Sequence, residues 1–384
     1  MSGRVLFYVQ HLLGVGHLKR AEILAGAMAA AGLDVTVAYG GLPFPEVPFN
    51  GLKVAQLPAA TIANEDFVTL LGASGSTVDE TWIAVRRARL LDLYRSIEPD
   101  VVLLELFPFG RRQFRFELLP LLEAIHATAE RPRVAASVRD ILVARKPERA
   151  AETVETLRRY FDAVLVHGDP ALIPFERTFT AADQISDLIR YTGYVCAAGR
   201  ATEKSDADDE VIVSAGGGAV GGPLLFAAMT ARPMTPLAGH RWRFLAGPNL
   251  PDAEYRRLSA TADNRTVVER FRPDFASRLR AAALSISQAG YNTTMDILAS
   301  GVRAVVVPYE TRGETEQRLR AEILAGKGLL TLVPEAELTP VRLAQAISLA
   351  LQSPRRTLDV NLAGAENAAR LVRDLAAQRR HLGG

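Results

Sequence analysis

The chain has 384 residues, of which 48% are hydrophobic, and its formal net charge is +2. This length predicts two domains with full-sized cores, and the hydrophobic content excludes a disordered chain. The balanced charge gives no electrostatic footprint for nucleic acid. A single cysteine, Cys196, forms no internal disulfide, which suits a reducing compartment. No apolar stretch reaches the ~18 residues of a membrane span, so we expect a cytoplasmic protein.

The first half alternates strand and helix patterns. A β-branched and aromatic run at Arg4–Gln10 predicts a buried strand, the stretch His17–Ala31 has helical periodicity, and Asp34–Tyr39 predicts the next strand. Helical segments follow at 82–97 and 153–162. Further strand patterns lie at Val101–Glu105, Arg133–Val138 and Ala163–His167. This alternation predicts a parallel, doubly wound sheet.

Residues 197–210 are small, polar and charged, and they predict a linker whose acidic side chains are solvated. The strand–helix alternation then restarts. Strand patterns lie at Val211–Ser214, Trp242–Leu245, Thr266–Val268, Ala283–Ser287, Ala304–Val307 and Leu329–Val333. We expect an α/β protein with two domains, 1–195 and 196–360, and a C-terminal helix over 361–384 that crosses back to the first domain.

A glycine-rich turn, Gly14-Val15-Gly16-His17, follows the first strand and starts a helix. Its glycines allow close approach to a ligand, and a helix N-terminus attracts negative charge. The third glycine of a dinucleotide fingerprint is missing, and no acid ends the second strand, so a dinucleotide site is disfavoured. His17 is a candidate general base.

The second half contains three further candidate segments. The first, residues 214–222, has five glycines between a strand and a helix, which suits a diphosphate. The second, residues 287–296, combines a glycine turn with a helix start that carries hydroxyls. The third, residues 308–317, is a polar loop whose acid and amide groups suit sugar hydroxyls. Each segment also has a purely structural interpretation, as a link between a strand and a helix or as a solvent-exposed loop without a binding role.

Taken together, the GxGHxxR start, the glycine-rich loop and the run SxAGYNTxxD…GVRAVVVPY…EQ resemble the GT-B glycosyltransferases. The most similar branch is glycosyltransferase family 28, which includes the bacterial peptidoglycan N-acetylglucosaminyltransferase. The start is also similar to that of the UDP-sugar hydrolase of pseudaminic acid biosynthesis. The resemblance implies two Rossmann-like doubly wound domains that face a cleft, with the acceptor on the first domain and the nucleotide sugar mainly on the second.

The resemblance also implies roles for single residues. Asp296 matches the acidic ribose ligand, as Asp where Glu is usual, and Glu316 and Gln317 match the pair that holds the sugar hydroxyls. Phe271 lies at the nucleobase loop. The residues expected along the diphosphate are Gly16, Gly217, Gly218, Gly290, Tyr291, Asn292 and Thr293.

The implied mechanism needs no cofactor and no metal, because amides and helix N-termini stabilise the leaving UDP. His17 deprotonates the acceptor hydroxyl for an inverting attack, and Glu105 and Asp140 are further base candidates. Three arginines, Arg111, Arg112 and Arg115, are candidates to bind an anionic acceptor, with a solvated basic face as the equal alternative. With the pair Phe107 and Phe109, they also predict peripheral contact with the inner membrane face if the acceptor is lipid-linked.

Two rival functions remain open on the sequence alone. A UDP-sugar hydrolase would keep the donor site and use water as the acceptor. A non-catalytic nucleotide-sugar-binding module would bind UDP and transfer nothing. Release of UDP from a UDP-sugar without an acceptor separates the hydrolase from the transferase.

Overall fold

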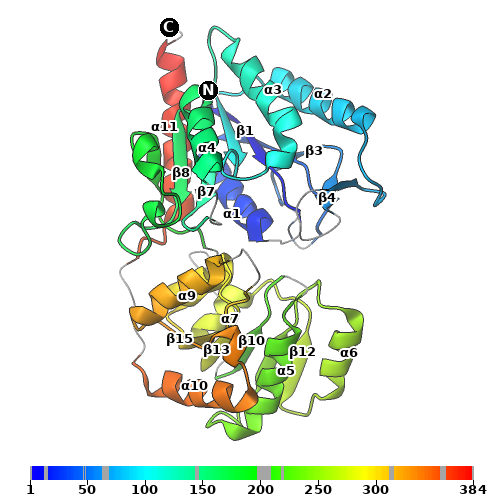
Figure 1. The fold of residues 1–384 in the computed structure, drawn as a ribbon, viewed down its shortest axis with the longest axis vertical. Helices are drawn as coiled ribbons and strands as arrows, with labels where there is room; N and C mark the ends of the chain where they lie inside the picture. The colour runs from blue at the N-terminus through cyan, green and yellow to red at the C-terminus, as the bar shows by residue number, and fades with distance from the viewer. Residues whose placement is uncertain are drawn as a thin grey trace. The chain divides into compact units, whose positions relative to one another are not determined.

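The computed structural model describes residues 2–12, 16–45, 47, 49–62, 69–142, 147–196, 209–217, 220–310, 315–354 and 360–382, the side chains of 380–382 excepted. The chain forms two compact units (Figure 1). Unit 1 comprises Met1–Val195 and Ala363–Gly384, and unit 2 comprises Cys196–Leu362. Each unit is built on one large parallel sheet, as the alternating sequence pattern predicts.

The sheet of unit 1 has the strand order β3-β2-β1-β6-β7-β8-β9. Its strands are β1 (Arg4–Val9), β2 (Asp34–Tyr39), β3 (Lys53–Gln56), β6 (Val101–Glu105), β7 (Arg133–Arg139), β8 (Ala163–His167) and β9 (Ile189–Tyr191). A separate antiparallel hairpin joins β4 (Ala60–Ile62) to β5 (Leu70–Gly72). The strand order reverses between β1 and β6, which makes this pair the switch point of the sheet.

Helices cover both faces of this sheet, and the interiors of its central strands are therefore mostly apolar. On one face lie α2 (Glu80–Ile97), α3 (Arg115–His126) and α4 (Pro147–Tyr160). On the other face lie α1 (Gly16–Ala30) and α11 (Gly364–Leu382). The last helix packs against α1, and Arg379 of α11 pairs with Asp100 at 2.6 Å.

The sheet of unit 2 has the order β12-β11-β10-β13-β14-β15, which is 3-2-1-4-5-6 when its strands are counted in chain order. The strands are β10 (Val211–Ser214), β11 (Trp242–Leu245), β12 (Thr266–Glu269), β13 (Leu284–Ser287), β14 (Ala304–Val306) and β15 (Thr331–Leu332). The helices are α5 (Gly222–Ala231), α6 (Asp252–Ala260), α7 (Phe275–Ala281), α8 (Tyr291–Ser300), α9 (Glu316–Gly326) and α10 (Pro340–Gln352). The switch point lies between β10 and β13.

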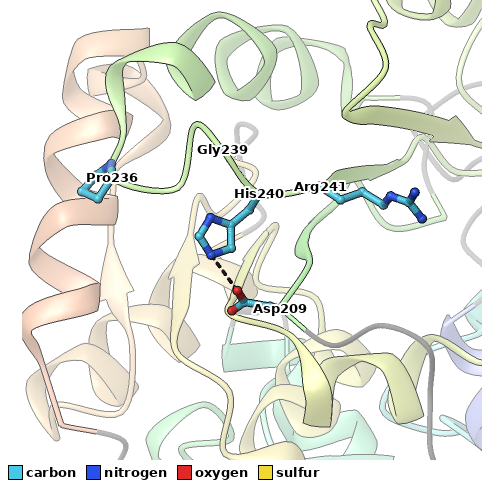
Figure 2. A pocket seen from close by; sticks show the side chains of 5 residues that line it. All are labelled: Asp209, Pro236, Gly239, His240 and Arg241. Atoms are coloured by element: carbon cyan, nitrogen blue, oxygen red, sulfur yellow. Dashed lines mark ion pairs between the residues drawn. The ribbon is translucent and has the colours of Figure 1, made fainter.

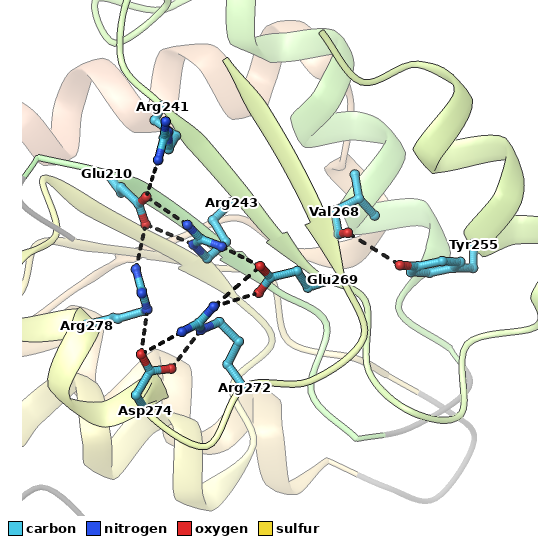
Figure 3. A network of polar contacts seen from close by, with 9 residues as sticks. All are labelled: Glu210, Arg241, Arg243, Tyr255, Val268, Glu269, Arg272, Asp274 and Arg278. Carbon is cyan, nitrogen blue, oxygen red and sulfur yellow. Dashed lines mark hydrogen bonds and ion pairs between the residues drawn. The ribbon is translucent and has the colours of Figure 1, made fainter. Parts of the chain in front are cut away.

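One face of this second sheet carries a network of ion pairs (Figure 3). Trp242 and Phe244 of β11 point into the apolar core with α5, α6 and α10, whereas Arg243 between them points to the opposite face. There Glu210 accepts hydrogen bonds from Arg243 at 2.9 and 3.0 Å and from Arg278 of α7 at 3.3 Å. Glu210 is buried, so the expectation that the acids of segment 197–210 are solvated is wrong for this residue.

Candidate functional site

The carboxyl edge of the first sheet brings His17 and Glu105 together. His17 is the second residue of α1, just after β1, and Glu105 is the last residue of the neighbouring strand β6. The imidazole Nδ1 lies 2.6 Å from Glu105 Oε1. The glutamate side chain is 1% exposed and that of His17 is 17% exposed, so the pair is sheltered and the imidazole still reaches solvent.

Two arginines hold the Glu105 carboxylate from other sides. Arg20, one turn after His17 on α1, donates to Oε1 at 2.8 Å, and Arg111 donates to Oε2 at 3.3 Å. Both guanidinium groups are nearly buried. Arg20 was not predicted as a site residue, although its spacing of three residues from His17 places both side chains on one helix face.

These charges determine the protonation states of the pair. Burial opposes ionisation of Glu105, but His17, Arg111 and Arg20 outweigh burial and hold the pKa of the carboxyl well below its usual range. Burial, together with Arg139 and Arg111, lowers the pKa of His17 to about 3, against the opposing effect of Glu105. At neutral pH the carboxylate is therefore ionised and the imidazole is neutral.

This protonation pattern fixes the tautomer of His17. An ionised carboxylate only accepts hydrogen bonds, so Nδ1 must carry the proton that it donates to Glu105. The other ring nitrogen, Nε2, is then an unprotonated acceptor. A neutral imidazole with an oriented acceptor nitrogen is suited to remove a proton from a hydroxyl.

Two more imidazoles lie near this pair and were not predicted as site residues. His11 hydrogen-bonds Tyr39 at 2.9 Å through Nδ1, and burial with the nearby Arg111 lowers its pKa to about 4, against the effect of Glu105. His167, fully buried, contacts Ser137 at 2.8 Å and Thr192 at 2.9 Å. Burial and Arg20 lower its pKa to about 3, although Glu105 opposes the shift.

Asp140, the third base candidate, directly follows β7 and is fully buried. Its Oδ1 accepts the backbone N–H of Ile141 at 2.9 Å. A side chain at Gly168 would place its Cβ 2.7 Å from the Cβ of Asp140, so the loop after β8 closes over this aspartate. These contacts place Asp140 at the same sheet edge as Glu105, and its role as a base stays a prediction.

The segment after β6 corrects one expectation. Phe107 and Phe109 are each 1% exposed, and Phe109 packs edge-on against Phe175 and Phe179. This aromatic pair belongs to the core and offers no apolar surface to a membrane. Arg112 and Arg115 both pair with Glu152, and Arg111 pairs with Glu105, so all three arginines already have carboxylate partners.

In unit 2 the glycine-rich loop after β10 closely approaches the loop after β11. Asn249 donates to the Gly217 carbonyl at 2.7 Å. A Cβ at Gly247 would lie 2.3 Å from the Gly216 carbonyl oxygen, so only glycine fits there. Gly218, the other residue predicted in this loop, lies outside the described residues.

The start of α5 faces a carboxylate. A Cβ at Gly222, the first residue of α5, would lie 2.0 Å from Glu254 Oε2. A carboxylate at a helix N-terminus complements the helix dipole and repels a second anion. This contact favours the start of α8 over the start of α5 as the place for a diphosphate.

The start of α8 collects most of the predicted donor residues. Gly290 precedes the helix in an extended conformation and has no side chain to cap it, and Tyr291, Asn292 and Thr293 form the first turn. Asp296 lies one turn further and is 8% exposed. The first-turn residues and Asp296 thus occur in sequence along one helix at the carboxyl edge of the sheet.

The predicted acid–amide pair begins α9. Glu316 is buried and pairs with Arg320 at 2.8 Å. Gln317 Oε1 accepts the backbone N–H groups of Ala289 at 3.0 Å and of Tyr309 at 3.2 Å. Through Ala289, the pair is connected to the turn that starts α8.

Phe271 lies two residues after β12, and its ring is 46% exposed. The preceding residue, Arg270, donates to the Leu250 carbonyl at 2.9 Å and so holds the loop after β11. An exposed aromatic ring next to this anchored residue suits stacking with a nucleobase.

A separate surface pocket of about 450 Å³ lies at the amino ends of β10 and β11 (Figure 2). Its lining includes Asp209 and His240, which pair at 2.8 Å. Ligands of open α/β sheets bind at the carboxyl ends of the strands, so this pocket is on the wrong edge for the candidate site.

Comparison with known proteins shows what the chain resembles. Residues 244–376 match the glycosyltransferase family 28 C-terminal domain. The UDP-N-acetylglucosamine–N-acetylmuramyl-(pentapeptide) pyrophosphoryl-undecaprenol N-acetylglucosamine transferase of Agrobacterium fabrum is 34% identical over 104 residues, which is 27% of this chain and 26% of that protein. The chain thus matches about a quarter of the length of that relative.

Solved structures match along nearly the whole chain. MurG of Acinetobacter baumannii has a TM-score of 0.59 and 18% identity, covering 98% of this chain and 99% of that one. The glycosyltransferase SsfS6 of Streptomyces sp. SF2575, complexed with thymidine diphosphate, has a TM-score of 0.58 and 16% identity, covering 98% and 96%. The protein therefore has the GT-B fold, and the resemblance to the family 28 branch is confirmed. Within the described residues, no helix combines the length and apolarity needed to cross a membrane.

Proposed function

We propose that this protein is a glycosyltransferase that moves a sugar from a nucleotide diphosphate sugar, a UDP-sugar in the first instance, to an acceptor hydroxyl. The observation that carries the proposal is the neutral imidazole of His17, held 2.6 Å from Glu105 at the switch point of the first sheet. The match of unit 2 to the family 28 C-terminal domain supports a sugar-nucleotide donor.

In this proposal unit 2 binds the donor. Asp296 accepts hydrogen bonds from the ribose diol, Glu316 and Gln317 hold the sugar hydroxyls, and Phe271 stacks on the base. The diphosphate is bound by backbone amides and small side chains, because these preorganised dipoles compensate its charge. The residues that supply them are Gly16, Gly217, Gly218, Gly290, Tyr291, Asn292 and Thr293.

The chemical step follows from the tautomer of His17. The acceptor hydroxyl loses its proton to Nε2 while its oxygen bonds to the anomeric carbon, and the bond from that carbon to the diphosphate oxygen breaks. Glu105 stabilises the imidazolium that forms, as the carboxylate does in a catalytic triad. A single in-line displacement inverts the anomeric carbon. The helix start at α8 stabilises the leaving diphosphate, so the step is proposed to need no metal.

We further propose that the protein acts in the cytoplasm on a hydroxyl acceptor, with a lipid-linked saccharide as the first acceptor to try. The relative from Agrobacterium fabrum is named for a pyrophosphoryl-undecaprenol acceptor. Peripheral contact with the membrane belongs to this proposal only if the lipid-linked acceptor is used. Sedimentation with anionic liposomes, with and without that acceptor, tests the contact.

The decisive experiment incubates the protein with UDP-sugars, with and without an acceptor panel, and measures UDP release and the anomeric configuration of the product by NMR. Transfer requires UDP release that depends on the acceptor and a product of inverted configuration, unchanged by EDTA. Rapid UDP release without acceptor would instead establish a hydrolase. If the protein binds UDP but shows no turnover under any condition, it is a non-catalytic nucleotide-sugar-binding module.

A further inference from the structure

We propose that Arg320 is a positioning residue of the donor site, which couples the sugar-binding start of α9 to the diphosphate-binding turn before α8. This inference rests on the proposed function, because a donor sugar and a diphosphate are what these two segments would hold. Arg320 itself touches neither in the proposal. It acts through Glu316 and through the backbone of Ala289.

The contacts of Arg320 connect three elements of the site. Its side chain is fully buried. One guanidinium nitrogen, Nη2, donates to Glu316 Oε1 at 2.8 Å, and the other, Nη1, donates to the Ala289 carbonyl at 3.2 Å. The guanidinium carbon also lies 5.5 Å from the centre of the Tyr291 ring, at the first residue of α8.

Gln317 also binds the backbone of Ala289, but at its N–H group rather than at its carbonyl. Its Oε1 accepts the N–H of Ala289 at 3.0 Å, while Arg320 binds the carbonyl of Ala289. Two side chains spaced by three residues on α9 therefore fix both polar groups of Ala289. Ala289 directly precedes Gly290 and Tyr291, so its orientation determines where the first amides of α8 point.

This arrangement also restricts how Gln317 can bind a sugar. Its oxygen already accepts two backbone N–H groups, at Ala289 and Tyr309. Within the part of the chain that the structure describes, its Nε2 makes no hydrogen bond. Gln317 is therefore assigned to donate to a sugar hydroxyl through Nε2, and Glu316 is the acceptor of the pair.

Arginine is specifically suited to this position. Its planar guanidinium presents separate donors to a carboxylate and to a carbonyl in fixed directions, whereas the ammonium group of lysine is a point charge on a flexible chain. Lysine at this position keeps the buried charge balance with Glu316, so the protein should still fold. It should lose the simultaneous grip on Ala289.

The test compares Arg320→Lys with Arg243→Lys as a matched control. Arg243 is also buried in unit 2, but it lies on β11 in the network of Figure 3, and its hydrogen bonds go to Glu210 and Glu269 rather than to the starts of α8 and α9. Calorimetry measures the affinity of each variant for UDP, TDP and uridine. Arg320→Lys should weaken diphosphate binding about tenfold and leave uridine binding unchanged, as expected for the loss of one buried hydrogen bond. Arg243→Lys should lower Tm without changing either affinity.

The outcomes separate this inference from the proposed function. If the unaltered protein binds neither UDP nor TDP, both the proposed function and the role of Arg320 are wrong. If it binds them and Arg320→Lys binds equally well, only the role of Arg320 is overturned. That role is also overturned if Arg243→Lys loses as much diphosphate affinity, or if uridine binding falls in parallel, because the effect would then be general destabilisation.

Discussion

The Nδ1 atom of His17 lies 2.6 Å from the Oε1 atom of Glu105, although 88 positions separate the two residues in sequence. The contact exists because β1 and β6 are neighbours with parallel register, so that a helix start after one strand meets the last residue of the other. The following predictions test what this pair and the second unit do.

Replacing His17 by alanine should lower kcat by about 10²- to 10⁴-fold, because the acceptor hydroxyl loses its base. UDP affinity should stay within about twofold, since the proposed donor residues other than Gly16 belong to unit 2. Steady-state kinetics and calorimetry measure the two quantities. His126→Ala, which removes an imidazole from α3 that contacts Tyr160, is the control. A large loss of UDP affinity in His17→Ala would mean that the histidine binds the donor.

Glu105→Gln should reduce both stability and turnover. The glutamine removes the carboxylate with which Arg20 and Arg111 pair in a buried site, which costs about 3 kcal/mol in unfolding free energy. The neutral side chain also no longer stabilises an imidazolium on His17, so kcat should fall.

The control for this variant is Glu117→Gln, because Glu117 is also a fully buried carboxylate of unit 1 and pairs with Arg86 at 2.9 Å. It should lose similar stability in urea unfolding while the folded fraction keeps its kcat. Equal kcat values for both variants would show that Glu105 has no catalytic role.

The stability of the protein should fall as the pH drops from 7 to 5. Burial keeps the pKa values of His11, His17 and His167 below 5 in the folded protein, at about 4, 3 and 3. The unfolded chain takes up protons on these groups near pH 6.5, so unfolding is favoured below that pH. Each histidine contributes about 2 kcal/mol to the loss between pH 7 and pH 5.

A variant isolates one of these groups. His167→Gln keeps a polar side chain beside Ser137 and Thr192 but cannot take up a proton. Between pH 7 and pH 5, the unfolding free energy of this variant, measured in urea, should fall by about 2 kcal/mol less than that of the unaltered protein. A protein that becomes more stable toward pH 5 would contradict the neutral state of these imidazoles.

Asp296→Asn should discriminate between two nucleotides. If Asp296 accepts hydrogen bonds from the ribose diol, the amide weakens UDP binding by about tenfold. TDP has no 2′-hydroxyl, so its affinity should fall by a smaller factor. Calorimetric Kd values for both nucleotides check this. An equal loss for UDP and TDP would show that Asp296 acts on another part of the nucleotide, or only on the fold.

The central strands of both sheets were predictable from the sequence, because a parallel sheet covered on both faces needs uninterrupted apolar runs. The observed strands β1, β2, β10 and β11 follow the predicted runs closely, and the two doubly wound sheets are confirmed. The edge strands β3 and β9 were missed. β3 has the sequence Lys53–Gln56 and is largely exposed, so it carries no such apolar run.

The site was predictable as a set of chain segments but not as a set of contacts. His17 and Glu105 could be named because each follows or ends a strand. The contacts of Arg20 and Arg111 with Glu105 could not be predicted, since both arginines reach it only once α1 and the loop after β6 are placed. Glu210 and Phe107 show the opposite failure: one acid at the end of a charged run and an aromatic residue, both expected at the surface, are buried in the structure.

The path of the last helix has a consequence for how the protein is made. The N–H of Gly364 donates to the carbonyl of Tyr194 at 3.1 Å, so the chain returns to unit 1 at the place where it left it. Unit 2 is thus an insertion between two parts of one domain. During synthesis unit 1 lacks the helix that covers α1 until α11 has left the ribosome, whereas unit 2 has its whole sequence earlier. A short peptide that joins residue 195 directly to residue 363 would therefore make unit 1 a separate domain without disturbing its core.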